Sequence, residues 1–208
     1  MLVRHHIEIT RLALGAEASP RALEAIVRAN VGQDGLRYQL GHDHFHFDNN
    51  RLERSYAYIE EQRALAGSAL ARGDAPSAWQ AFGRLTHAAQ DFYAHTDYIP
   101  RWLSLFDAGT PPAPEEVDPV FSEILSHPGL RSGKLYYPLE ALTFLPRVGK
   151  FFAPFFPADS HARMSLDDHD GTGRFDYAFH AAVKRTKIEF EKTTGTFSTK
   201  MLADFIDK

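Results

Sequence analysis

The chain has 208 residues, with 23 Lys and Arg, 27 Asp and Glu, and a formal net charge of −4. This length predicts a core large enough to be stable without disulfide bonds. The absence of cysteine excludes disulfides and thiolate metal sites, and the negative charge argues against a protein that coats nucleic acid. The outlier is histidine, which occurs 11 times. Without cysteine, any transition-metal site must be built from histidine and carboxylates.

Hydrophobic periodicity and helix start signals favour helices along most of the chain. In chain order, the expected helices cover residues 4–14, a segment from Pro20, residues 51–72, a segment capped by Asp74 that continues to about Tyr98 and stops before Pro100, and residues 118–126, 174–192 and 198–207. No strand alternation is seen. The predicted fold is an all-α, single-domain helical bundle over 1–208, with a long irregular insertion around 105–160.

The N-terminal segment indicates no targeting signal or membrane anchor. Charge begins at Arg4, no apolar run has the length of a signal peptide, and none reaches the roughly 20 residues that span a bilayer. We therefore expect a soluble, cytoplasmic protein, with a leader removed by processing as the alternative.

The segment THAAQDFYAHTDY carries the strongest chemical pattern. His87, Asp91 and His95 follow one another at intervals of four, which places them on one helix face, one turn apart. Imidazoles and a carboxylate on adjacent turns converge on a metal ion in other helical sites. Asp91 lies in the middle and has two oxygens, so it is suited to bridge two metals. The alternative is a polar, solvated face.

A second histidine cluster, GHDHFHFDNN, alternates polar and aromatic residues. In an extended segment His44, His46 and Asp48 point one way, while Phe45 and Phe47 point together into the core. This pattern suits a loop that presents metal ligands, with His46 and Asp48 favoured. A histidine-rich surface loop is the alternative.

Several segments, in this order, resemble the zinc-dependent phospholipase C and single-strand-specific nuclease superfamily, closest to the branch related to the fungal heterokaryon-incompatibility protein. They are an N-terminal His followed by IEITRLAL, then IVRANVGQD, HFDN, GRLTHAAQDFYAHTDY and SHARMSLDD. The resemblance implies an all-α bundle with two or three zinc ions. The metal ligands that it implies are His6, His46, Asp48, His87, Asp91, His95 and His161. Read from the residues alone, His6 also fits a hydrogen-bonded core position and His161 a loop or cap. Whether Asp34, Asp167, Asp168 or His44 completes the site stays open.

The function implied is metal-dependent hydrolysis of a phosphodiester, phospholipase C-like and zinc-dependent, with a phospholipid or small phosphodiester as substrate. Paired metals activate water and clamp the attacking and leaving oxygens, and Asp48 is the candidate to orient that water or act as base. The alternatives are a single-strand nuclease of the same superfamily and a metal-stabilised binding module without activity. Nucleic acid is disfavoured because no basic stripe accompanies the histidines.

Residues 145–157, LPRVGKFFAPFFP, combine four phenylalanines with Arg147 and Lys150. Three prolines prevent a long helix here. Apolar side chains flanked by cations are typical of a membrane interface, so this segment is a candidate for peripheral membrane contact. Ordinary packing of a long loop against the core is the alternative.

Overall fold

A computed structural model describes residues 1–39, 41–107, 110–136, 153–169 and 171–208. Within these ranges the regular structure is entirely helical, and β-pairing is limited to two isolated bridges, Thr96–Ser132 and Lys134–Ser160. The all-α prediction is therefore confirmed.

The longer helices lie close to their predicted positions. They are α1 (Val3–Leu14), α2 (Pro20–Val31), α4 (Leu52–Ala71), α5 (Ala75–His95), α10 (Arg174–Thr194) and α11 (Thr199–Ile206). The shorter helices are η1 (Gly32–Asp34), α3 (Leu36–Gln39), η2 (Asp43–Phe45), α6 (Tyr98–Leu103), η3 (Pro114–Glu116), α7 (Ser122–Leu125), η5 (Ala153–Phe155) and α9 (His161–Met164).

Side-chain caps explain where several helices begin. The Ser19 hydroxyl accepts a hydrogen bond from Ala22 N before α2, and the Asp74 carboxylate accepts one from Ser77 N, at 3.1 Å in each case. Ser198 caps α11 in the same way. Each cap satisfies a backbone N–H that the first turn of a helix leaves without a partner.

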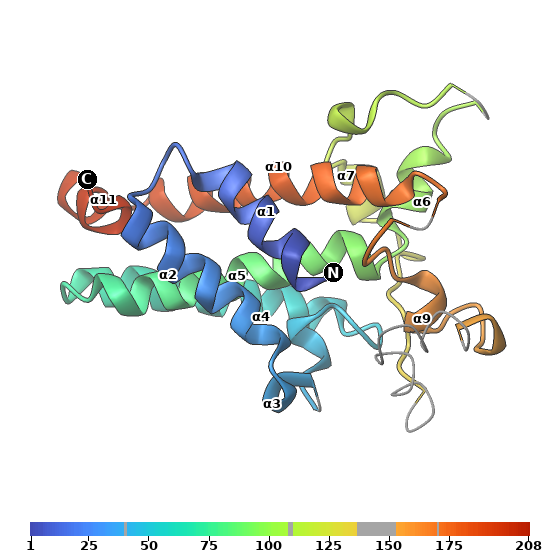
Figure 1. Ribbon diagram of the computed structural model, residues 1–208, viewed down its shortest axis with the longest axis horizontal. Helices are drawn as coiled ribbons and strands as arrows, with labels where there is room; N and C mark the ends of the chain where they lie inside the picture. Colours follow the sequence, from blue (N-terminus) through green and yellow to red (C-terminus); the bar gives the residue numbers. More distant parts are fainter. Residues whose placement is uncertain (40, 108–109, 137–152, 170) are drawn as a thin grey trace.

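Helix α5 is the central element of the bundle. It packs against α2, α4 and α10, which surround it along its length (Figure 1). Its residues are buried from Ala78 to His95 with two exceptions, the exposed Gln80 and the half-buried Arg84. Gly83 allows the close approach of α2, because a Cβ there would lie 2.7 Å from Ala29 Cβ. The polar residues of α5 from Thr86 to His95 are therefore enclosed by protein.

The predicted end of α5 near Tyr98 is wrong by one turn. The helix ends at His95, Thr96 is extended, and the chain starts again as α6 at Tyr98. Pro100 does not stop the chain but lies in the first turn of α6, where the missing N–H has no helical partner to lose. The break matters for the site because it leaves His95 in the last turn of α5.

The loop from 43 to 50 is not the extended segment that alternation predicts. Residues 43–45 form the single turn η2, and Phe47, Asn49 and Asn50 have positive φ of 54–55°. Phe47 is fully buried, as expected, whereas Phe45 is only partly buried. Phe45 stacks on Tyr58, and the backbone at Phe47 forms a strained turn, so side chains in this loop do not alternate as they would in a strand.

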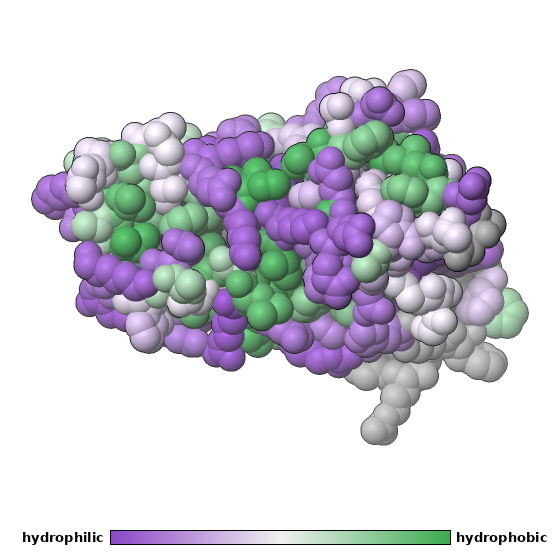
Figure 2. Space-filling model, turned by 90° about the horizontal axis from the view of Figure 1, so that it is seen from above, coloured by the Kyte–Doolittle hydropathy of each residue, from purple (hydrophilic) through white to green (hydrophobic). Residues whose placement is uncertain are grey.

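The predicted irregular insertion contains only short helices in its described parts, namely η3, α7 and η5. Most of the segment 145–157 lies outside the described residues, including Phe151 and Phe152. Phe155 is described, and 77% of it is exposed. Among the described residues, no helix combines the length and apolarity needed to cross a membrane. Figure 2 shows apolar surface on one face as separate areas bounded by hydrophilic side chains.

Candidate metal centre

Asp91 lies at the middle of a buried group of histidines and carboxylates near the end of α5. Its carboxylate is fully buried. One oxygen, Oδ2, lies 3.0 Å from His46 Nδ1 and 3.1 Å from His87 Nε2. These two ring nitrogens are themselves 3.1 Å apart. Ligand atoms around a tetrahedral zinc ion are separated by about 3.3 Å, given Zn–N distances near 2.0–2.1 Å. The three atoms therefore have the mutual spacing of three zinc ligands.

The other oxygen, Asp91 Oδ1, faces a second set of ligand atoms. His6 Nε2 lies 3.2 Å away and His95 Nε2 3.9 Å away. His95 Nε2 is also 3.0 Å from Asp167 Oδ1. The two oxygens of one carboxylate thus point into two neighbouring sets, which is the arrangement of a bridging ligand.

A positive charge lies within the second set. The amino group of Met1 is 2.7 Å from Asp91 Oδ1, 2.9 Å from Asp167 Oδ1 and 3.2 Å from His95 Nε2. Burial lowers the pKa of this amine, but Asp167 and Asp91 outweigh burial and raise it to about 11. This position is therefore one that the surrounding oxygens make strongly favourable for a cation.

His161 and Asp48 form a pair at the edge of the centre. His161 Nδ1 lies 2.8 Å from Asp48 Oδ1, and His95 Nδ1 lies 3.6 Å from the same oxygen. Burial opposes the charge on His161, yet the carboxylates of Asp48 and Asp167 raise its pKa to about 9. Gly133 backs this pair so closely that a Cβ there would lie 2.5 Å from His161 Cα.

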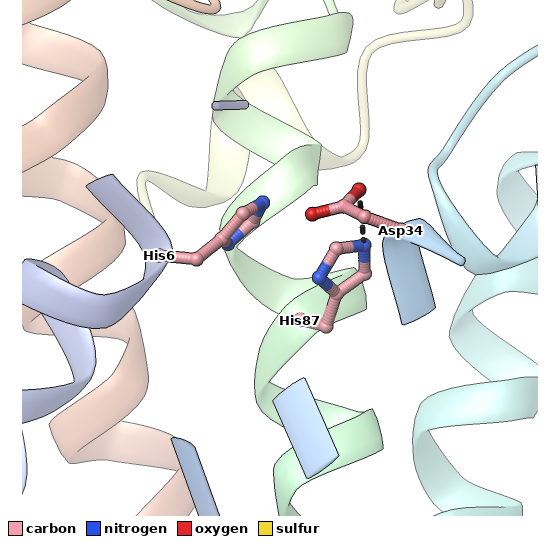
Figure 3. Close-up of side chains that lie close together, drawn as sticks. All are labelled: His6, Asp34 and His87. Atoms are coloured by element: carbon pink, nitrogen blue, oxygen red, sulfur yellow. Dashed lines mark ion pairs between the residues drawn. The ribbon is translucent and has the colours of Figure 1, made fainter. Parts of the chain in front are cut away.

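Asp34 is a further carboxylate close to His6 and His87. Figure 3 shows it extending from η1 toward His87 of α5 and His6 of α1, and its Oδ1 lies 3.8 Å from His87 Nε2. The rings of His6 and His87 stack at 4.3 Å. Three elements that are distant in sequence therefore meet at this point.

A second layer of hydrogen bonds orients the ligands. His6 Nδ1 lies 2.7 Å from Gln90 Oε1, and the Gln90 amide nitrogen donates to Thr10 and Thr186. Since Gln90 Oε1 only accepts, His6 Nδ1 carries a proton, and in the neutral imidazole the lone pair is on Nε2, which faces Asp91. His95 is oriented in the same way, because its Nδ1 donates to His46 O at 2.6 Å. Metal-binding histidines are commonly held by such partners.

The protonation states of Asp91 and His87 suit metal binding. Burial opposes the charge on His46, but Asp91 raises its pKa, so a metal ion there must displace a proton. Burial by itself would raise the pKa of Asp91, but the Met1 amine and the surrounding histidines hold it well below its usual range. Burial lowers the pKa of His87 to about 4, so its imidazole is neutral at pH 7. His6 Nε2 is buried and makes no hydrogen bond to the described residues. An ionised carboxylate and neutral imidazoles with lone pairs are what zinc requires.

All the residues that the sequence analysis proposed as ligands lie in or beside this group: His6, His46, Asp48, His87, Asp91, His95 and His161. Of the residues left open, Asp34 and Asp167 reach it. His44 packs against Phe45 and Tyr58, and Asp168 pairs with Arg4 and His5. The sequence analysis did not propose a role for Gln90, although this polar residue directly precedes Asp91.

One family model matches the chain. It is described as the VWA7 N-terminal domain and matches residues 8–102, just under half of the chain. The matched region is similar to that domain and contains the loop ligands and α5, while His6, His161 and Asp167 lie outside it. No curated protein and no solved structure matches the chain.

The resemblance to the zinc-dependent phospholipase C and nuclease superfamily, and to the heterokaryon-incompatibility branch, is therefore wrong. The match is to the VWA7 N-terminal domain and carries no link to those proteins. The phosphodiester hydrolase function, which that resemblance implied, is therefore also wrong. The short segments misled because His and Asp at i, i+4 intervals follow from helix geometry wherever a helix supplies several ligands. The catalytic role predicted for Asp48 stays a prediction.

Proposed function

We propose that this chain binds divalent metal ions, zinc by the chemistry of its donors, at two adjacent sites that share Asp91. The observation that carries the proposal is the triangle of His46 Nδ1, His87 Nε2 and Asp91 Oδ2, with edges of 3.0–3.1 Å. Two imidazole nitrogens facing each other at this distance share at most one proton. A metal ion satisfies both nitrogens and the carboxylate at once.

The second proposed site lies on the Asp91 Oδ1 side. Its candidate ligands are His6, His95 and Asp167, with Asp34 between the two sites and Asp48–His161 at the edge. Nitrogen and oxygen donors without thiolates suit zinc, and they also suit copper, nickel and iron. The Irving–Williams order makes copper a competitor in vitro, so metal identity is part of the test.

A bound zinc ion would supply a Lewis acid and a water whose pKa is lowered to about 7. The side chains of Asp34 and Asp167 are 23% and 31% exposed, which makes them the most exposed of the candidate ligands, although Asp34 Oδ2 itself is buried. The prediction that the chain is an enzyme stays a prediction, and it depends on this metal.

The test is metal analysis of the full chain purified without added metal, followed by zinc titration after chelation. We expect about two zinc ions per chain. Asp91→Asn should remove most of the metal at both sites, because one carboxylate serves both. His87→Gln should remove the first site preferentially.

Matched controls are Asp107→Asn and His180→Gln; Asp107 is exposed, and His180 pairs with Glu115 and belongs to none of the ligand groups. They should keep wild-type metal content. Wild-type protein that takes up no zinc after chelation, or Asp91→Asn protein that binds as much as the wild type, would overturn the proposal. Cobalt substitution gives an independent reading, because tetrahedral sites have intense visible absorption.

A further inference from the structure

A cleft lined by arginines lies beside the metal centre. It has a volume of about 380 Å³, and four of its eleven lining residues are Arg101, Arg131, Arg163 and Arg174, which we call the arginine cleft. These side chains come from α6, the segment before Ser132, α9 and the first turn of α10. Helices α6 and α9 and the start of α10 lie at one end of the bundle (Figure 1).

The charge of the arginine cleft is opposite to that of the chain. The net charge of the protein is −4, whereas the cleft has four cations and one acidic residue, Asp97. Arginine stays charged at all physiological pH values, so the local excess of positive charge is permanent. Like charges held in one cleft repel one another, and a bound anion removes that repulsion.

The single carboxylate is engaged on one side of the cleft. Asp97 Oδ2 lies 2.9 Å from Arg101 Nη2 and 3.6 Å from Arg131 Nε. Arg163 and Arg174 are exposed, and among the described residues no carboxylate lies within ion-pair distance of either. Arg163 Nη1 has only a long contact, 3.5 Å, to Phe156 O. These two guanidinium groups are therefore available to a ligand.

The cleft and the metal centre are separate but share a wall. None of the proposed metal ligands lines the cleft. However, Thr96 directly follows His95, and Leu166 directly precedes Asp167; both line the cleft. Leu166 N donates to Ala94 O at 2.8 Å, which joins the two segments of the wall.

We propose that the arginine cleft binds a tetrahedral oxyanion, the phosphate or sulfate group of a small molecule, through Arg163 and Arg174. A guanidinium donates two parallel N–H groups, which matches the oxygen spacing of such an anion. The small volume fits one such group with part of its parent molecule. The proposal stands independently of the metal sites.

The test is calorimetric titration of inorganic phosphate, and separately of sulfate, into the full chain at low ionic strength. We expect one anion per chain, with an affinity that falls as salt is added. The double variant Arg163→Ala/Arg174→Ala should weaken binding by about tenfold or more, since each lost charge-assisted pair weakens the complex. The anion that binds more tightly shows whether the cleft prefers a phosphate or a sulfate group.

The matched control is Arg28→Ala/Arg72→Ala, which removes the same charge from exposed positions outside the cleft. It should change the affinity by less than about twofold, the effect of distant screened charges. If the alanine double variant is unfolded by circular dichroism, Arg163→Lys/Arg174→Lys keeps the charge and should still weaken binding through loss of the bidentate geometry.

Asp91→Asn separates this site from the metal centre. Retained anion binding in Asp91→Asn supports the cleft. The proposal is overturned if Asp91→Asn abolishes binding while the arginine variants keep it, since the anion then binds metal. It is also overturned if the wild type binds neither anion, or if the control pair weakens binding as much as the cleft pair.

Discussion

Gln90 is the residue whose role is least visible in the sequence and most specific in the structure. Its Oε1 accepts from His6 Nδ1 at 2.7 Å and from Asn30 Nδ2 at 3.1 Å, and the residue is fully buried. Gln90 is not itself a candidate metal ligand, because its oxygen faces His6 and Asn30. Its contribution is to fix the direction of the His6 lone pair.

We expect Gln90→Leu to lower zinc affinity by about 10–100-fold, the usual effect of removing an outer partner of a metal-binding histidine. The unfolding free energy should fall by about 1–3 kcal/mol, because the buried donors of His6 and Asn30 lose their acceptor. Zinc titration and urea unfolding measure the two effects. Gln80→Leu, on the exposed face of the same helix, is the control and should change neither quantity appreciably. Unchanged zinc affinity in Gln90→Leu would show that His6 is held by other contacts.

His161 gives a pH dependence to the chelated protein. Its pKa in the fold is raised to about 9, above the value of about 6.5 expected in the unfolded chain. The folded state therefore holds the proton more tightly. The stabilisation is fully present below about pH 6.5 and is lost as the pH rises to about 9.

We expect the unfolding free energy of chelated wild type to fall between about pH 6.5 and 9, and the fall to be smaller in His161→Gln. Urea unfolding at several pH values measures this. The comparison is made between the two proteins because the Met1 amine and His46 also titrate with raised pKa values. Equal slopes for wild type and variant would mean that His161 is not charged in the fold.

Helix geometry predicts only some of the ligands, those on a regular element. His87, Asp91 and His95 follow from the 3.6-residue period of α5, which is a local property of the chain. Asp34 lies in the single turn η1, and Asp167 follows the four-residue helix α9. Neither segment has a period long enough to assign a direction to one side chain, so tertiary packing alone places these carboxylates.

At the scale of elements, α5 and α2 approach closely at a glycine. A Cβ on Gly83 would meet Ile26 O, would lie 2.7 Å from Ala29 Cβ and would be 3.0 Å from Asn30 N. Gly67 on α4 provides the matched contrast, because a Cβ there would meet only Phe197 Cε1, at 3.8 Å.

We expect Gly67→Ala to stabilise the protein by about 0.5–1 kcal/mol, since alanine is the better helix former. Gly83→Ala should instead destabilise it by about 1–3 kcal/mol, because overpacking outweighs the same helical gain. It should also weaken zinc binding, since displacing Asn30 disturbs Gln90. Thermal unfolding and zinc titration of both variants check this. The two substitutions must change the stability in opposite directions. Stabilisation by both would contradict the close α2–α5 contact.

The sequence predicted long helices better than the connections between them. The positions of α1, α2, α4 and α10 follow from apolar periodicity and from caps such as Ser19 and Asp74. The break at Thr96 and the turn at Phe47 do not, because each depends on contacts with distant segments. Asp97 N donates to Arg131 O, and Asn49 N donates to Gly133 O. A local pattern contains no information on those partners.

At the scale of the whole molecule, metal binding and folding are coupled. The ligands of the proposed centre are assembled only in the folded state, so bound metal stabilises that state by mass action. At a free zinc concentration of about 100 times Kd, one site adds about 2.7 kcal/mol. For a chain of this size that raises Tm by about 5–10 °C.

We therefore expect chelated wild type to regain Tm on addition of zinc, measured by scanning calorimetry. Asp91→Asn, which lacks the shared carboxylate, is expected to show little response. A zinc-induced rise of the same size in Asp91→Asn would locate the stabilising metal elsewhere.

The spread of the ligands along the chain has a kinetic consequence. With metal bound, His6, His46, Asp91 and Asp167 are tied to one point, so the centre cross-links α1, the loop before α4, the central helix and the segment after α9. The chain has no disulfide to do this. Unfolding must then break coordination, and the dissociation rate of the metal becomes part of the unfolding rate. Protein loaded with zinc would persist in strong denaturant for a time set by ligand exchange at the metal, while the chelated chain would unfold at the rate of its helices alone.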